Sequence, residues 1–301
     1  MLQDIKPHVF YNEYKSNLIR PRDVVLVFVQ DKVLVKRDSE VLFPTVEECK
    51  DREQLQYLFR IDETKYYLFM FKKDKRATGT EMLQEAMIES IHDMLQEQVD
   101  WVLVRSLRDT AERKDCFAAA TAYHLYVWYR DNRYCGRCGG KLASDKKERM
   151  LFCEKCHNTV YPKIAPAVIV GLIHNNHILM TKYADREYKR YALVAGFTEI
   201  GETAEETVQR EVMEEVGLKV KNISYYKSQP WGFDSNLLMG FFAQLDGGDD
   251  IRLEEEELAS AEWIRREQAV HMNDGVSLTR EMMEYFYQKG EEEIFKNQVI
   301  G

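Results

Sequence analysis

The sequence predicts an α+β protein in three parts: a small N-terminal α+β domain (residues 1–130), a cysteine-rich segment (131–162) and an α/β/α sandwich (163–301). Three observations support this prediction. The length of 301 residues exceeds what one compact core usually takes. Four of the six cysteines are concentrated between the two outer parts. Short apolar runs typical of strands occur on both sides of that segment, together with helical patterns.

The composition is ordinary for a globular protein, with 45% hydrophobic and 31% charged residues. The formal net charge of −9 argues against a broad basic face for nucleic acid, although a local basic groove stays open. No charged-then-apolar leader opens the chain, and the longest apolar runs, 24–29 and 167–173, are too short to cross a bilayer. We therefore expect a cytoplasmic protein that does not enter membranes.

The first part contains strand patterns around a turn at Gln30-Asp31 and two helical patterns. The expected strands are 24–29, 32–35 and 66–71, and the expected helices are 80–98 and 115–130. Nothing catalytic can be identified in this region. It is expected to be a scaffold or a dimerisation domain.

The second part holds two Cys-x-x-Cys pairs, formed by Cys135, Cys138, Cys153 and Cys156. In a reducing cytosol this pattern indicates a metal site rather than disulfides. Four thiolates on two tight turns can close a tetrahedral cage around zinc, with iron in a rubredoxin-like cage as the alternative. Four thiolates leave no open coordination position, so the site is expected to be structural.

The third part predicts mixed strands around helices, which favours an α/β/α sandwich. The expected strands are 168–173, 178–181, 223–228, 237–244 and 261–264, with a turn at Asn175-Asn176 between the first two. The expected helices are 204–216 and 277–289.

The helix over 204–216 carries the chemistry. Glu211, Glu214 and Glu215 are spaced i, i+3 and i+4, so they project from one helix face. Three adjacent carboxylates repel one another unless cations lie between them, and hard oxygen ligands favour Mg²⁺ or Mn²⁺. Such a cation stabilises charge on a pyrophosphate and lowers the pKa of bound water. Arg210 can hold a glutamate through paired hydrogen bonds. The alternative is a solvated acidic helix surface.

Glycines flank this helix in a regular pattern. Gly196 and Gly201 are expected to let the preceding loop turn sharply, and Gly217 suits the helix C-terminal cap. From Gly196, the segment GFTEIGETAEETVQREVMEEVGL fits Gly-x5-Glu-x7-Arg-Glu-U-x-Glu-Glu-x-Gly-U, where U is apolar, at every fixed position. A solvated acidic surface does not explain why the glycines and the arginine also fit.

This segment resembles the Nudix box. A four-cysteine ribbon directly before it and Ser228-Gln229-Pro230-Trp231 after it resemble the bacterial NADH pyrophosphatase family, which also removes NAD caps from RNA. The similarity covers about residues 124–290, including Trp128, Tyr134, 161–166 and 195–197. It implies a zinc ribbon at 131–162, a Nudix hydrolase domain at 163–301 and a homodimer, with the N-terminal region or the ribbon at the interface.

The resemblance also implies roles for individual residues. It assigns metal binding to Glu211, Glu214, Glu215, Glu257 and the carbonyl of Ala195. Tyr161 and Phe197 match aromatic residues that hold the nicotinamide by stacking. A stretch that distinguishes dinucleotide substrates corresponds to Gln229, Pro230, Trp231, Gly232, Phe233, Asp234, Ser235 and Asn236. A turn that touches substrate corresponds to the segment containing Thr279.

The chain departs from the family motif Ser-Gln-Pro-Trp-Pro-Phe-Pro-x-Ser, because Gly232, Asp234 and Asn236 replace Pro, Pro and Ser. Trp231 and Phe233 preserve the expectation of an aromatic pocket. Two lost prolines are expected to loosen the loop, and Asp234 adds a negative charge near an anionic ligand. Thr279 replaces a family alanine.

Three functions follow as hypotheses. The first is hydrolysis of NADH or NAD⁺ to AMP and nicotinamide mononucleotide. The second keeps the catalyst but takes ADP-ribose, another nucleoside diphosphate or the NAD cap of RNA; RNA would require a basic rim, for which the candidates are Lys141, Lys146, Lys147 and Arg149. The third is a ligand-sensing protein with an inactive Nudix fold, against which the intact box argues.

Overall fold

The computed structural model divides the chain into two compact units. Unit 1 comprises Met1–Leu2, Ile164–Trp231 and Asn236–Gly301, and unit 2 comprises Gln3–Lys163 and Gly232–Ser235. The structure describes residues 1–14, 18–36, 38, 40–70, 98–184, 191–254, 258–269 and 274–296. Of the helix expected over 80–98, residues 80–97 lie outside the described residues.

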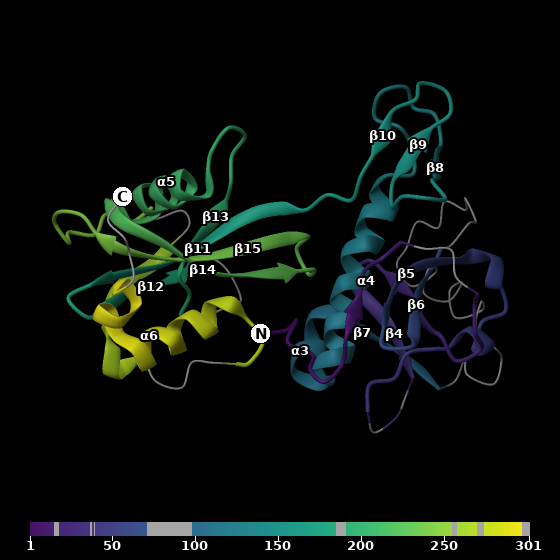
Figure 1. The fold of residues 1–301 in the computed structure, drawn as a ribbon, viewed down its shortest axis with the longest axis horizontal. Helices are drawn as coiled ribbons and strands as arrows, with labels where there is room; N and C mark the ends of the chain where they lie inside the picture. Colours follow the sequence, from purple (N-terminus) through teal and green to yellow (C-terminus); the bar gives the residue numbers. More distant parts are fainter. Residues whose placement is uncertain are drawn as a thin grey trace. The chain divides into compact units, whose positions relative to one another are not determined.

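Unit 1 is built on a six-stranded mixed sheet (Figure 1). Its order is β14-β15-β11-β12-β16, and β13 pairs with β11. β11 pairs in parallel with β15 and antiparallel with β12, to which it connects through Asn175 and Asn176 at φ 48° and 58°. The strands are β11 (Ala165–His174), β12 (His177–Tyr183), β13 (Val194–Phe197), β14 (Val220–Trp231), β15 (Asn236–Leu245) and β16 (Leu258–Arg265).

Helices cover both faces of this sheet. Successive side chains of the central strand β11 point to opposite faces, so the strand contributes to two separate cores. Val168, Val170 and Leu172 belong to a core that includes buried residues of α5 (Ala204–Val216). Ile169 and Ile173 belong to a second core with buried residues of α6 (Leu278–Phe295). A sheet between two helices is an α/β/α sandwich, so the predicted fold class is confirmed (Figure 1).

The predicted elements of unit 1 are all present. α5 has the predicted bounds, and the strands extend one to three residues beyond theirs in most cases. α6 continues past the predicted end at residue 289 through a kink at Gly290, where φ is 68° and ψ is 174°. The short helix η4 (Arg266–Gln268) follows β16.

Before the cysteine-rich segment, the described part of unit 2 contains two small sheets and the long helix α4 (Arg113–Asp131). The sheet orders are β1-β5-β6-β2 and β3-β4-β7. Ring contacts attach α4 to the strands, with Phe10 to Phe117 at 5.0 Å and Phe28 to Tyr126 at 5.2 Å between centroids. The strands are β1 (Phe10–Tyr11), β2 (Val24–Leu26), β3 (Phe28–Val29), β4 (Lys32–Lys36), β5 (Leu55–Ile61), β6 (Thr64–Phe69) and β7 (Val99–Leu103), and the short helices are η1 (Val46–Glu48), η2 (Arg52–Gln54), η3 (Val104–Ser106) and α3 (Leu107–Thr110).

The cysteine-rich segment forms a three-stranded sheet of β8 (Leu142–Ser144), β9 (Leu151–Cys153) and β10 (Thr159–Val160). It is connected to the N-terminal strands within unit 2. The hydroxyl of Tyr14 donates to the carbonyl of Asp145 at 3.1 Å, and the Arg149 guanidinium donates to the Asn12 side chain at 2.7 Å. The boundary predicted at residue 130 stays a prediction.

Candidate active site and zinc centre

The helix α5 begins and ends where its sequence specifies. Thr203 and Glu206 form a capping box: the Thr203 hydroxyl accepts from the Glu206 N–H at 3.2 Å, and the Glu206 carboxylate accepts from the Thr203 N–H at 2.7 Å. Gly217 terminates the helix in the left-handed conformation at φ 69°. These caps fix the register of the helix, and therefore the face on which the glutamates lie.

Two of the three glutamates pack against strand β13. Glu211 and Glu215 are 9% and 3% exposed, whereas Glu214 is exposed to solvent. The Glu215 carboxylate accepts from the Ala195 N–H at 3.4 Å. A Cβ atom added to Gly196 would lie 2.0 Å from the Glu211 carboxyl carbon. Gly196 is therefore needed for this close approach, and the sharp turn expected there is wrong because Gly196 lies within β13.

Arg210 connects the preceding loop to the glutamates. Its guanidinium makes paired hydrogen bonds to Glu202, at 2.6 and 3.0 Å, as the sequence predicted. One of its nitrogens, Nη1, also donates to Glu211 and Glu214, each at 2.8 Å. Nη2 donates to the carbonyl of Phe197 at 2.8 Å. The Arg210 guanidinium thus positions the carboxylates of Glu202, Glu211 and Glu214 and also the last residue of β13.

These contacts shift the proton affinities of both partners. The Arg210 hydrogen bonds, followed by the N–H of Glu199, lower the pKa of Glu202 to about 2. The same ion pair raises the pKa of Arg210. Arg210 therefore stays charged, and Glu202 stays ionised well into the acid range.

The glutamate oxygens do not converge in the side-chain positions of this structure. Over the described parts of the chain, only the four cysteines bring three or more His, Cys, Asp or Glu ligand atoms within 4.8 Å of one another. Nη1 of Arg210 lies between the Glu211 and Glu214 carboxylates and holds both. Glu257 lies outside the described residues, so its assignment stays a prediction.

The four cysteine sulfurs form a compact cluster. The Sγ atoms of Cys135 and Cys156 are 3.6 Å apart, and those of Cys138 and Cys153 are 3.5 Å apart. Tetrahedral zinc with bonds of about 2.3 Å places its sulfurs about 3.8 Å apart. The cluster therefore fits a structural zinc site.

Backbone amides donate to sulfurs of this cluster, including those of Cys135 and Cys153. Burial raises the pKa of the Cys135 thiol, but hydrogen bonds from the N–H groups of Arg137 and Cys138 outweigh it and lower the pKa to about 6. The N–H of Cys156 lowers the pKa of Cys153. The N–H of Asn158 lowers the pKa of Cys156, but hydrogen bonds with the neighbouring cysteine sulfurs and burial outweigh it and raise that pKa to about 12. Thiolates, not thiols, bind zinc, so the backbone amides favour the metal-binding form of Cys135 and Cys153.

The two aromatic residues assigned to nicotinamide stacking have exposed rings. Tyr161, in unit 2, is 57% exposed, and its hydroxyl donates to Glu148 at 3.1 Å. Phe197, at the end of β13 in unit 1, is 53% exposed. Large exposed rings on a folded protein are typical of binding surfaces, so the accessibility of both suits stacking.

The side chain of Gln229 is held inside unit 1. Its side chain is fully buried in unit 1, where its amide nitrogen donates to the carbonyl of Val276 and its amide oxygen accepts from the Leu278 N–H, both at 2.8 Å. Its assignment to substrate binding stays a prediction. Gln229 ties β14 to the first turn of α6, where Thr279 is half-buried.

The remaining residues of the discriminating stretch lie around the β14–β15 connection. Pro230 and Trp231 end the edge strand β14, and Asn236 begins β15 and is 8% exposed. Ser235 has a positive φ of 59°. Asp234 forms an ion pair with Arg105, so its charge is balanced rather than left near a ligand as expected.

The basic rim expected beside the ribbon is smaller than predicted. Lys141, Lys146 and Lys147 are exposed. Arg149 donates instead to the carbonyls of Asn12 and Leu58, and burial lowers its pKa. It joins the ribbon to the N-terminal strands.

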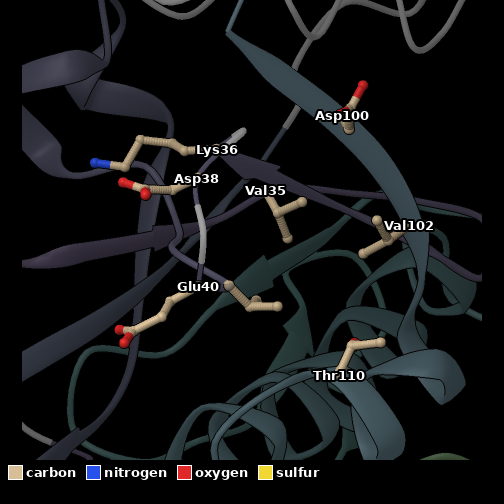
Figure 2. Close-up of a pocket in the computed structure, with 8 residues that line it drawn as sticks. Val35, Lys36, Asp38, Glu40, Asp100, Val102 and Thr110 are labelled. Atoms are coloured by element: carbon tan, nitrogen blue, oxygen red, sulfur yellow. The ribbon is translucent and has the colours of Figure 1, made fainter.

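A cavity of about 560 Å³ lies elsewhere in unit 2. Figure 2 shows Asp38 and Glu40 on one side of it and Asp100, from β7, on another. It contains no residue of the box or of the discriminating stretch. Its carboxylates would repel a pyrophosphate, so it is not assigned to substrate.

Sequence reasoning missed Arg105 and Ala120, which contact residues 232–235. More than a hundred positions separate them from that turn in the sequence, and neither lies in a motif. Local spacing therefore carries no signal for them.

Known proteins resemble the chain over its ribbon and its third part. Residues 163–286 match the NUDIX domain, and residues 130–161 match the NADH pyrophosphatase zinc ribbon domain. The NAD-capped RNA hydrolase NudC of Photorhabdus laumondii is 39% identical over 166 residues, covering 55% of this chain and 64% of that protein. NudC of Escherichia coli (strain K12 / DH10B) is 41% identical over 147 residues, covering 49% and 57%.

The chain thus spans less than two thirds of the length of these relatives. A crystal structure of a NUDIX hydrolase from Nitrosomonas europaea is 23% identical, with a TM-score of 0.45 over 52% of this chain and 92% of that chain. Among the described residues, none of the helices has the length and apolar character to cross a membrane. Two adjoining domain matches, a complete Nudix box and a four-thiol cluster lead to one conclusion: residues 163–286 form a Nudix domain, and it directly follows a segment, 130–161, that matches the NADH pyrophosphatase zinc ribbon.

Proposed function

We propose that the protein hydrolyses the pyrophosphate bond of NADH or NAD⁺ to AMP and the nicotinamide mononucleotide, using Mg²⁺ or Mn²⁺. The observation that best supports this proposal is the packing of Glu211 and Glu215 against Ala195 and Gly196. Arg210 fixes the loop that precedes the helix. The relatives named NAD-capped RNA hydrolases support the substrate class.

The donor set suits a hard divalent cation, since glutamate carboxylates would hold it with the carbonyl of Ala195. When bound, the cation would neutralise phosphate charge and make a water more acidic. Nη1 of Arg210 would have to release Glu214, which is exposed and free to rotate toward the ion. Glu202 would keep the guanidinium in place during that change through its paired contact.

The chain's own groups perform the rest of the reaction. A water oxygen forms a bond to one phosphorus, the bond between that phosphorus and the bridging oxygen breaks, and the bridging oxygen leaves with the other phosphate. A carboxylate on α5 accepts the proton of the water. The resemblance assigns nicotinamide stacking to Tyr161 and Phe197, and each of these rings is exposed within its own unit.

A panel of NADH, NAD⁺, ADP-ribose and diadenosine polyphosphates tests this proposal. We expect release of AMP and the mononucleotide from NADH or NAD⁺, in the presence of Mg²⁺ or Mn²⁺. A strong preference for ADP-ribose would contradict the nicotinamide assignment, although pyrophosphatase activity itself would still be supported. Tight binding of one nucleotide without turnover of any would instead indicate a ligand sensor.

A second candidate substrate is the NAD cap of RNA, which the names of the relatives favour. Lys141, Lys146 and Lys147 provide exposed positive charge near the ribbon. Comparison of the release of nicotinamide mononucleotide from NAD-capped transcripts with hydrolysis of free NAD⁺, at two salt concentrations, separates the substrates. Neutralising the three lysines should slow decapping and leave free NAD⁺ hydrolysis unchanged.

The proposal includes a cytoplasmic homodimer. A reducing compartment suits the six free thiols, and the family resemblance supports the dimer. Light scattering of the purified chain should give twice the 35.5 kDa monomer mass. A monomer mass would refute this assembly.

A further inference from the structure

The turn Gly232–Ser235 connects β14 to β15, yet its contacts group it with unit 2. Both flanking strands belong to unit 1. The turn also contains two of the three positions at which the chain departs from the family motif. Its contacts within unit 2 show what the departing residues do.

Gly232 lets the turn rest directly on the backbone of α4. A Cβ atom added there would lie 2.2 Å from the Ala120 carbonyl oxygen and 2.6 Å from its carbonyl carbon. These are main-chain atoms in the middle of a helix whose residues Ala118 and Ala119 are fully buried, so they cannot move aside. Proline or any other residue with a Cβ is therefore excluded at this position.

Side chains of the turn itself make further contacts with Arg105. Asp234 forms an ion pair with Arg105, and the Arg105 guanidinium carbon lies 5.7 Å from the ring centroid of Phe233. Phe233 is 6% exposed. With Tyr123, these residues line a cavity of about 250 Å³.

We propose that Arg105 is a positioning residue: together with the backbone of Ala120 it holds the turn Gly232–Ser235 in one conformation, and it thereby sets the preference for dinucleotides. We call these two contacts the latch. This inference rests on the proposed function, because the resemblance assigns residues 229–236 to dinucleotide choice. A proline ring stiffens a loop by restricting φ. In this chain tertiary contacts replace that stiffness. A latched turn loses less conformational entropy when substrate orders it, so binding of the dinucleotide is stronger.

Hydrogen exchange of the peptide spanning 229–238 tests the latch independently of catalysis. Arg105→Ala and Asp234→Ala should each speed exchange about two- to fivefold, because the ion pair is half-exposed. Gly232→Ala should speed it about tenfold or more, because backbone has to separate from backbone. Gly248→Ala is the matched control, since a Cβ there meets no atom within 4 Å. Unchanged exchange in all three variants would overturn the latch.

Kinetics test the effect on specificity. In Arg105→Ala, the KM for NADH should rise about two- to fivefold while kcat changes little and the KM for ADP-ribose stays constant. The charge-swapped double variant R105D/D234R should restore both KM and exchange, which a merely structural defect would not do. Faster exchange with an unchanged ratio of the two KM values would overturn the specificity role. A wild-type protein that hydrolyses none of the panel would refute the proposed function, while exchange would still decide the latch.

Discussion

Arg210 shows how one side chain organises the catalytic box. Its guanidinium contacts Glu202 on the loop, Glu211 and Glu214 on its own helix and the carbonyl of Phe197 on β13. Planar, permanently charged and forked, arginine can make these contacts together, which lysine cannot. The carboxylates outnumber this one cation, and that excess of negative charge favours binding of divalent ions.

Glu215→Gln should reduce turnover of NADH by about a hundredfold or more, because a neutral amide is a poor ligand for Mg²⁺ and accepts no proton. Zinc content should stay at the wild-type value, since the cysteines are untouched. Steady-state kinetics and metal analysis measure the two effects. Glu205→Gln, at an exposed position of the same helix, is the control. Equal activities in the two variants would exclude Glu215 from the site.

Glu202→Gln should destabilise the protein in a pH-dependent way. The folded pKa of Glu202 is lowered to about 2 from its ordinary value of 4.5, so the ionised pair stabilises the fold fully above pH 4.5. That stabilisation is lost progressively as the pH falls from 4.5 toward 2, while the glutamine variant has no such dependence at this site.

Urea unfolding of both proteins at pH 7, 5 and 3 measures this difference. The gap in free energy of unfolding should be similar at pH 7 and 5 and smaller at pH 3. A gap of constant size would mean that the Glu202–Arg210 pair does not form in solution.

At the scale of elements, the site depends on how closely α5 approaches β13. Caps at Thr203 and Gly217 fix the ends of the helix, and Val208 and Val212 bury its inner face against the sheet. The helix face that carries Glu211 and Glu215 then meets the strand at residues without large side chains, Ala195 and Gly196. Helix packing therefore delivers the carboxylates, and small residues in the strand make space for them.

Gly196→Ala should impair catalysis more than stability. The added methyl would collide with the Glu211 carboxylate, the movable end of a side chain, so the fold should lose no more than about 1 kcal/mol. The displaced carboxylate should lower kcat about tenfold or more. Thermal unfolding and steady-state kinetics give the two values, and Gly248→Ala should change neither. If the lower activity were fully accounted for by a smaller fraction of folded protein, this role of Gly196 would be contradicted.

At the scale of the whole molecule, two metal-binding chemistries are kept apart by ligand type. Carboxylates of unit 1 suit Mg²⁺ or Mn²⁺, and the thiolates of unit 2 suit zinc. The zinc ligands lie on short strands, whose segment contacts the N-terminal strands through Tyr14 and Arg149. Zinc thus stabilises unit 2 rather than acting on substrate.

Cys153→Ser should abolish zinc binding and unfold the ribbon, lowering the stability of unit 2 by at least about 3 kcal/mol. Metal analysis should find one zinc per wild-type chain and almost none in the variant. Cys49→Ala, which removes a buried thiol outside the cluster, should keep its zinc. A coloured wild-type protein containing iron would instead support the rubredoxin-like alternative.

The sequence by itself determined the fold class of unit 1, the bounds of α5, the four-thiol cluster and the ability of Arg210 to hold a glutamate through paired hydrogen bonds; the structure identified that glutamate as Glu202. These features follow from motif spacing, helix capping and side-chain alternation, which can be recognised along the sequence without knowing how distant elements pack. Sequence could not predict that Gln229 is buried against α6, that Glu211 requires Gly196, or that Gly232 and Asp234 meet Ala120 and Arg105. Those contacts join residues far apart in the chain, and only the packing of elements in three dimensions decides which of them meet.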